Sequence, residues 1–126
     1  MTQTERRRYL IAALLKEQPQ YAKIEIPSRE QEQKSLLRSL FNKRMPLPVT
    51  DEFAAVQDAY LQEEIRRKGI TALSDLTPIQ KGIYLWRGDI TTLQCDGIVN
   101  AANSQMLGCF CPNHGCIDNA IHTFAG

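Results

Sequence analysis

Three cysteines and one histidine lie within eight residues, in the segment Cys109-Phe-Cys-Pro-Asn-His-Gly-Cys116. Thiolate sulfur and neutral imidazole nitrogen are the ligands that Zn²⁺ prefers. The segment follows an apolar run typical of a strand and precedes a helical pattern, which favours chemistry on an anionic ligand over a purely stabilising metal. All four cysteines lie in the last quarter of the chain, which favours metal binding or catalysis over a spaced disulfide framework. The fourth, Cys95, is predicted to be a core residue.

The first half of the chain has the apolar spacing of three amphipathic helices. Helix starts are indicated by capping residues and helix stops by glycine and proline. We predict capping boxes at Thr2 with Glu5 and at Ser28 with Gln31, a third cap at Thr50, and a helix stop at Gly69. The apolar stripes of these helices are predicted to pack against one another as a core.

The pattern changes from helix to strand after residue 70. The predicted elements are strands at 83–86 and 95–100, a turn or helix start at 77–78, and a helix over 117–125 that Gly126 would end. His122 on that helix is predicted to be a packing residue and not a metal ligand. Strand, loop, strand, loop, helix is the opening of a layered α/β domain. Because two strands and one helix cannot cover a sheet on both faces, we expect the front part of a larger domain.

Charge is unevenly distributed along the chain. All 15 lysines and arginines lie at or before Arg87, and the residues that follow carry three acids. A phosphate bound there would therefore be held by backbone N–H groups, a helix N-terminus or a metal. The basic residues are interleaved with acids, which argues against a nucleic-acid partner. No apolar run approaches the roughly 20 residues of a membrane span, and residues 9–15 are interpreted as helix and not as a signal peptide, so we expect a cytoplasmic protein with no membrane partner.

The last part of the chain carries motifs in a distinctive order. They are Arg87-Gly-Asp-Ile-Thr, Asp96-Gly-Ile-Val-Asn-Ala-Ala-Asn-Ser, Leu107-Gly and Cys116-Ile-Asp-Asn-Ala-Ile-His. Together they resemble the macrodomain family. With the inserted cysteines and histidine, the segment is similar to the zinc-containing macrodomains of microbes, which act as ADP-ribosyl hydrolases and often accompany a lipoyl-linked sirtuin. The resemblance covers roughly the last third of the chain well and the helical half in outline.

This resemblance implies a three-layer α/β/α fold, of which the chain would contain the opening strands and the first helix. Residues 1–75 would form an N-terminal helical extension and residues 76–126 the N-terminal part of a macrodomain. The remainder, including a Gly-rich loop around the pyrophosphate and distal ribose, would be absent. We therefore expect little or no activity from this chain in isolation.

The resemblance also implies which residues bind ADP-ribose. Asp89 would be a buried acceptor for the adenine amino group, beside the Ile90 backbone, because a carboxylate has no donor of its own. Asn100 and Asn103 flank small alanines, including Ala102, that allow close approach, and Asn103 would hold a ribose hydroxyl. Two alternatives need no ligand: Asp89 caps a turn, and the two asparagines form an Asx-type turn.

The zinc ligands implied by the resemblance are Cys109, His114 and Cys116. Three protein ligands leave a fourth position open, as in catalytic sites, whereas a further ligand at Cys111 would make the site closed and structural. The family pattern does not require a cysteine at 111, and its role is left open. Asp118 and Asn103 would act in catalysis near the distal ribose. The alternative is that Asp118 only complements the dipole of the last helix.

The predicted function is zinc-dependent hydrolysis of the N- or O-glycosidic bond between mono-ADP-ribose and a protein side chain. The partners would be ADP-ribose and a mono-ADP-ribosylated protein, with a lipoyl-carrier protein implied by the resemblance. Two alternatives remain open. One is a macrodomain that binds ADP-ribose without cleaving it, and the other is a zinc-stabilised interaction module with all four donors on the metal.

Overall fold

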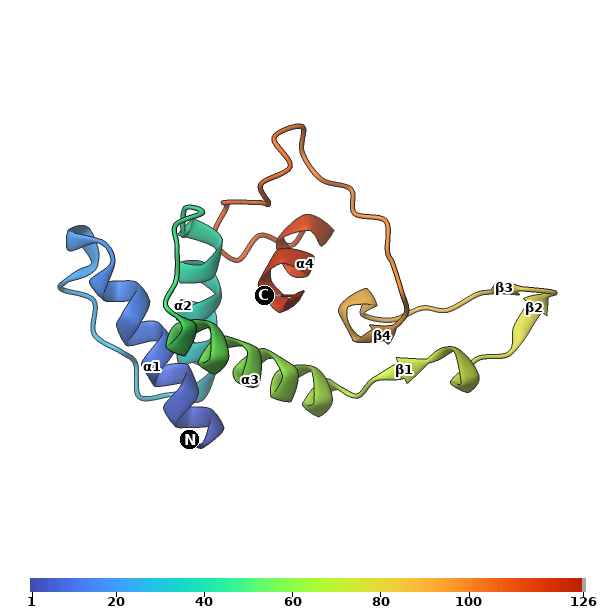
Figure 1. Ribbon diagram of the computed structural model, residues 1–126, viewed down its shortest axis with the longest axis horizontal. Helices are drawn as coiled ribbons and strands as arrows, with labels where there is room; N and C mark the ends of the chain where they lie inside the picture. Colours follow the sequence, from blue (N-terminus) through green and yellow to red (C-terminus); the bar gives the residue numbers. More distant parts are fainter. Residues whose placement is uncertain (126) are drawn as a thin grey trace.

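The computed structural model describes residues 1–125 and combines helices with short strands, an α/β organisation. Helices α1 (Gln3–Lys16), α2 (Glu30–Lys43) and α3 (Asp51–Lys68) gather on one side, and an extended segment reaches away from them (Figure 1). The last helix, α4 (Ile117–Ala125), returns to lie against α2 (Figure 1). Within residues 1–125, no helix combines the length and apolarity needed to cross a membrane. Gly126, the predicted stop of the last helix, lies outside the described residues.

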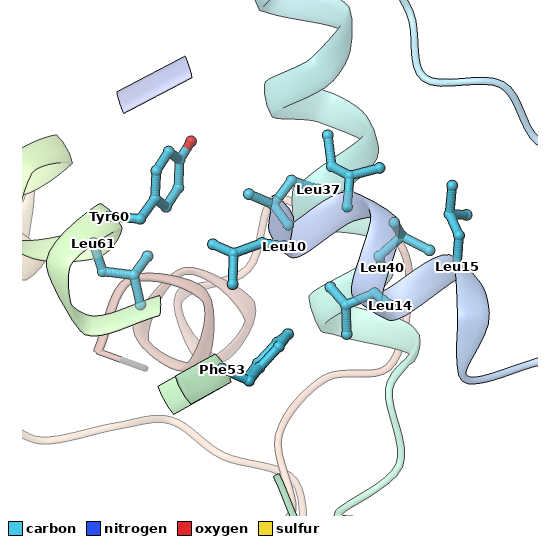
Figure 2. Packing of buried hydrophobic residues seen from close by; sticks show 9 residues of the cluster. Leu10, Leu14, Leu15, Leu37, Leu40, Phe53, Tyr60 and Leu61 are labelled. Carbon is cyan, nitrogen blue, oxygen red and sulfur yellow. The ribbon is translucent and has the colours of Figure 1, made fainter. Parts of the chain in front are cut away.

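The hydrophobic core lies between α1, α2 and α3 (Figure 2). It consists of Leu10, Ile11, Leu14, Leu15, Leu37, Leu40, Phe53, Tyr60 and Leu61. Because fully burying one side chain of this size stabilises a fold by roughly 1.5–3 kcal/mol, the predicted packing of apolar stripes is the main source of stability in this half.

Most of the predicted helix signals are confirmed. Thr2 and Glu5 form a reciprocal capping box, Thr50 accepts a hydrogen bond from the backbone of the first turn of α3, and Gly69 follows α3 at φ 91°, a backbone angle that favours glycine. The box predicted at Ser28 is wrong, because α2 begins at Glu30 after an Arg29 cap without a side-chain bond. The chain entering α2 is held instead by Gln33, which donates to the Pro27 carbonyl at 2.7 Å. A short 3₁₀ turn, η1 (Pro19–Tyr21), connects α1 to this entry.

The strands form two separate pairs. Strand β1 (Thr71–Ala72) runs parallel to β4 (Leu93–Gln94), and β2 (Pro78–Gln80) forms an antiparallel hairpin with β3 (Ile83–Tyr84). Short 3₁₀ turns, η2 (Leu73–Asp75) and η3 (Ile90–Thr92), follow β1 and precede β4. Within residues 1–125 the two pairs do not join into one sheet.

Two strand predictions need correction. The strand predicted at 83–86 is confirmed only for Ile83–Tyr84, and Pro78 opens a strand and not a turn or helix. Residues 95–100 are not a strand: no neighbouring strand pairs with them within the described chain, and Val99 is 90% exposed. Cys95, predicted in the core with that strand, is exposed for the same reason. An apolar run encodes a tendency toward burial, but a strand also needs a partner for its backbone groups.

Helix α4 is fastened to the helical half by polar contacts. Asn42 of α2 donates to the Thr123 hydroxyl at 3.0 Å, and both side chains are buried. The aromatic ring of Phe124 lies under the Lys68 ammonium of α3, at 3.4 Å from ring centroid to nitrogen. The segment before α4, which carries the predicted metal ligands, is thereby held next to α2.

Candidate functional site

The donor atoms of Cys109, His114 and Cys116 all lie within 4.8 Å of one another. The Cys109 Sγ is 3.7 Å from His114 Nδ1. Tetrahedral zinc with bonds of roughly 2.3 Å to sulfur and 2.0 Å to nitrogen separates such ligands by about 3.5 Å, so the spacing fits one zinc ion with little movement. Cys111 is exposed and does not belong to this group. Three of the four predicted candidate donors therefore converge, and that set would leave a metal with one position free of protein.

The loop that carries these donors turns back through two residues in the left-handed region. Gly108 has φ 96° and Asn113 has φ 54°, a conformation that asparagine tolerates better than most residues. The His114 N–H donates to the Cys111 carbonyl at 3.2 Å and closes the turn. The Cys111 N–H also lowers the pKa of the Cys109 thiol, an effect that partial burial opposes and that Cys116 and Asn119 reinforce. Because zinc binds the thiolate, this environment favours metal binding.

Replacing Gly108 with alanine is expected to destabilise this loop by about 1–2 kcal/mol, because a Cβ is strained at positive φ. The added Cβ would also lie 3.1 Å from the His122 ring. Gly115→Ala is the matched control in the same loop, since nothing lies within 4 Å of its Cβ position and its φ is ordinary. Hydrogen exchange of the loop amides measures the effect. Equal exchange rates in the two variants would contradict this account of the turn.

Asp118 lies in the first turn of α4 and is only 3% exposed. Its Oδ1 accepts a hydrogen bond from Asn100 Nδ2 at 2.8 Å, and His122 Nδ1 lies 3.1 Å from the same oxygen. His122 also contacts the Asp118 carbonyl at 3.0 Å and is not part of the metal-donor group. Within residues 1–125 the buried Asn100 Oδ1 has no hydrogen-bond partner. A buried acceptor without a donor is costly, so it is suited to receive a hydroxyl of a ligand.

Asp89 and Ile90 lie at η3, which contacts both α3 and α4. The Asp89 carboxylate caps this turn, accepting from Thr91 N–H at 3.0 Å and Thr91 Oγ1 at 2.6 Å, and it pairs with Lys68 Nζ at 3.2 Å. The limited desolvation at this turn would raise the pKa of Asp89, but the hydrogen bonds from Thr91 and Lys68 lower it overall. The predicted burial of this carboxylate is wrong, since Asp89 is exposed. Turn capping, the alternative that needs no ligand, is observed here.

Asn103 is engaged within its own loop. Its Nδ2 donates to the Gly108 carbonyl at 2.9 Å and its Oδ1 accepts from the Gln105 N–H at 3.0 Å, which is an Asx-type turn. Ala102 is exposed, and its N–H donates to the Asn100 carbonyl at 2.9 Å. The structure therefore joins Asn103 to Gly108, the residue before the first metal donor, and joins Asn100 to Asp118.

Two residues at this site are not among the sequence-based predictions. Asn119 is completely buried and contacts the loop that carries the donors, and Arg38 of α2 contacts both Asn119 and that loop. The position of Asn119, three residues after Cys116 at the start of a helix, is a signal that could have identified it. Nothing in the sequence links Arg38 to a loop more than 70 residues away. The part of the chain after Arg87 lacks cations of its own, but the fold supplies Arg38 and Lys68 from the helical half.

Known proteins resemble most or all of this chain. A protein of Treponema medium named protein-ADP-ribose hydrolase is 58% identical over 130 residues, which cover 100% of this chain and 50% of that protein. A protein of the same name from Staphylococcus aureus strain MRSA252 is 50% identical over 119 residues, or 94% of this chain and 44% of that protein. A Fusarium oxysporum f. sp. cubense protein named probable bifunctional ADP-ribose hydrolase/ADP-ribosyltransferase is 46% identical over 103 residues, 73% of this chain and 17% of its own length. No family model matches the chain.

The chain spans about half the length of the first two of these curated relatives. The matches include the helical half, for which the motifs in the sequence gave a resemblance only in outline. The matches with proteins named protein-ADP-ribose hydrolase therefore cover both the helical half of this chain and the segment that carries the donors.

Proposed function

We propose that this chain forms the metal-binding part of a zinc-dependent macrodomain that hydrolyses the bond between mono-ADP-ribose and a protein side chain. The observation that carries the proposal is the convergence of Cys109, His114 and Cys116 just before the buried Asp118. The names of the similar proteins support the hydrolysis of protein-linked ADP-ribose. In this proposal residues 1–75 are a helical extension, and residues 76–126 begin the macrodomain.

Asp118 is the proposed proton acceptor for the attacking water. Within residues 1–125 both polar contacts of its side chain, from Asn100 and His122, are made to Oδ1, so Oδ2 can face a water molecule. Those contacts fix the plane of the carboxylate, which is what a general base requires. Water adds to the ribose carbon and gives a proton to Asp118, the glycosidic bond breaks with its electron pair leaving on the protein side chain, and the proton then passes from Asp118 to that leaving atom. When bound, zinc would supply a positive charge that polarises a ribose oxygen or lowers the pKa of that water.

The remaining predicted residues are proposed to position ADP-ribose. The Asn100 Oδ1 accepts a hydroxyl of the distal ribose, which provides the partner that this buried atom lacks. Asn103 holds a ribose hydroxyl in place of one of its present loop contacts, and Ala102 leaves room for the ligand beside the backbone. Asp89 accepts the adenine amino group next to the Ile90 backbone, sharing its carboxylate with Lys68. The modified partner is a protein, and by family resemblance a lipoyl-carrier protein.

Release of ADP-ribose from a mono-ADP-ribosylated carrier protein tests the proposal. We suggest assaying a chimera in which this chain replaces the matching 130 residues of the Treponema medium relative. The zinc-loaded chimera is expected to release ADP-ribose, and removal of the metal by a chelator is expected to stop the release. Binding of ADP-ribose without release would favour a non-catalytic macrodomain. Zinc binding without any affinity for ADP-ribose would favour an interaction module.

A further inference from the structure

We propose that Arg38 of α2, acting through Asn119, positions the loop of metal ligands and thereby raises the affinity of the site for zinc. Arg38 is a positioning residue, and this inference rests on the zinc site proposed above. It assigns to the helical half of the chain a positioning role at the metal centre, across 76 residues of sequence to His114 and 81 to Asn119.

The guanidinium of Arg38 donates hydrogen bonds to two acceptors, the His114 carbonyl and Asn119 Oδ1. Its Nη2 donates to the His114 carbonyl at 3.1 Å, and its Nε and Nη2 donate to Asn119 Oδ1 at 3.2 and 2.9 Å. Because the guanidinium is planar with donors in a fixed fork, it sets the relative position of its two acceptors. One of these acceptors belongs to a candidate zinc ligand, and the other belongs to a side chain that reaches the remaining ligands.

Asn119 in turn contacts both cysteines of the candidate zinc site, Cys109 and Cys116. Its Nδ2 donates to the Cys111 carbonyl at 3.0 Å and to the Cys109 carbonyl at 3.4 Å. Its backbone N–H donates to Cys116 Sγ at 3.4 Å. Every candidate ligand is therefore one hydrogen bond from Arg38 or Asn119. Since Asn119 is completely buried, its amide has few other orientations to adopt.

A second contact from the same helix holds the tip of the loop. The Asn113 N–H donates to Asn42 Oδ1 at 3.0 Å, and Asn42 also binds Thr123 of α4. A loop ordered in this way before the metal arrives loses less conformational freedom on binding, and this preorganisation raises affinity. Removing an outer contact of a metal ligand typically lowers metal affinity by about 10- to 100-fold.

The test measures zinc affinity of the 126-residue chain by competition with a chromophoric chelator. Arg38→Ala is expected to weaken zinc binding by about 10- to 100-fold, and Arg38→Lys, which cannot make the bidentate contact, is expected to fall between Ala and the unaltered chain. Lys43→Ala removes an exposed cation from the same helix and is expected to leave affinity unchanged. Leu36→Ala removes a side chain packed on the core and controls for lost stability.

Cobalt(II) provides a second readout, because its visible absorption bands report the geometry of the ligands. We expect altered bands in Arg38→Ala and unaltered bands in Leu36→Ala and Lys43→Ala. Wild-type affinity and bands in Arg38→Ala would overturn the inference, and so would an equal loss of affinity in Leu36→Ala. Absence of zinc binding by the unaltered chain would instead overturn the proposed metal site itself, so the two failures are distinguishable.

Discussion

Replacement of Cys116 by alanine is expected to weaken zinc binding by about 100- to 1000-fold. Structural zinc sites with four ligands bind with roughly 10–16 kcal/mol, or about 2.5–4 kcal/mol for each ligand, and 1.4 kcal/mol corresponds to tenfold in affinity. Among the candidate zinc ligands, Cys116 is the one that joins the loop to α4, because its sulfur accepts a hydrogen bond from the Asn119 N–H. Cys116→Ala is therefore expected to lower the zinc affinity of the chain and the turnover number of the chimera with the Treponema medium relative. Chelator competition measures the first and ADP-ribose release the second.

Two further variants make this prediction specific. Cys116→Ser keeps an acceptor for the Asn119 N–H but is a poorer zinc ligand, so it is expected to retain the fold of α4 and still lose zinc. Cys111→Ala removes the exposed cysteine outside the donor group and is expected to bind zinc as the unaltered chain does. If the Cys111 variant loses as much affinity as the Cys116 variant, the site has four protein ligands and is structural.

Replacement of Asp118 by asparagine is expected to lower the turnover number of the extended chimera by about 100- to 10,000-fold, the usual contribution of a positioned general base. The substitution preserves size, and the new Oδ1 can still accept the hydrogen bond from Asn100, so the fold and the zinc affinity are expected to persist. ADP-ribose binding is expected to change little, because the proton transfer occurs only in the reaction. Steady-state kinetics together with calorimetry separate these effects.

The matched control for this prediction is Asp96→Asn, which removes an exposed acid from the same part of the chain. It is expected to leave both turnover and binding unchanged. Normal turnover in Asp118→Asn would show that Asp118 serves only the dipole of α4, the alternative that its place in the first helical turn allows.

Local signals in the sequence predicted the local structure. Thr2, Thr50 and Gly69 mark helix ends that depend only on neighbouring residues, and all three predictions are confirmed. The α/β organisation was also predictable, because apolar periodicity changes after residue 70. Convergence of Cys109, His114 and Cys116 followed from their proximity in sequence, since a short loop can bring them together.

The predictions that were wrong, and the contacts that were missed, concern residues whose structure depends on partners far away in the sequence. The strand predicted at 95–100 has no strand beside it within the described residues, and Cys95 is exposed with it. The capping box predicted at Ser28 does not form, and Gln33 holds the start of α2 instead. The Gln33 amide oxygen also accepts a hydrogen bond from the buried Arg7 of α1 at 2.9 Å. The contacts of Arg38 with Asn119 and of Lys68 with Asp89 join segments 81 and 21 residues apart. Such pairs form only when the helices pack, so no local pattern predicts them.

X-ray absorption at the zinc edge tests the central claim most directly. On the zinc-loaded chain the account predicts one ion per molecule, with two sulfur ligands at about 2.3 Å, one imidazole nitrogen at about 2.0 Å and one light atom that exchanges with solvent or added ADP-ribose. A sphere of three sulfurs and one nitrogen that ADP-ribose does not alter would contradict it, as would a chain that binds no zinc.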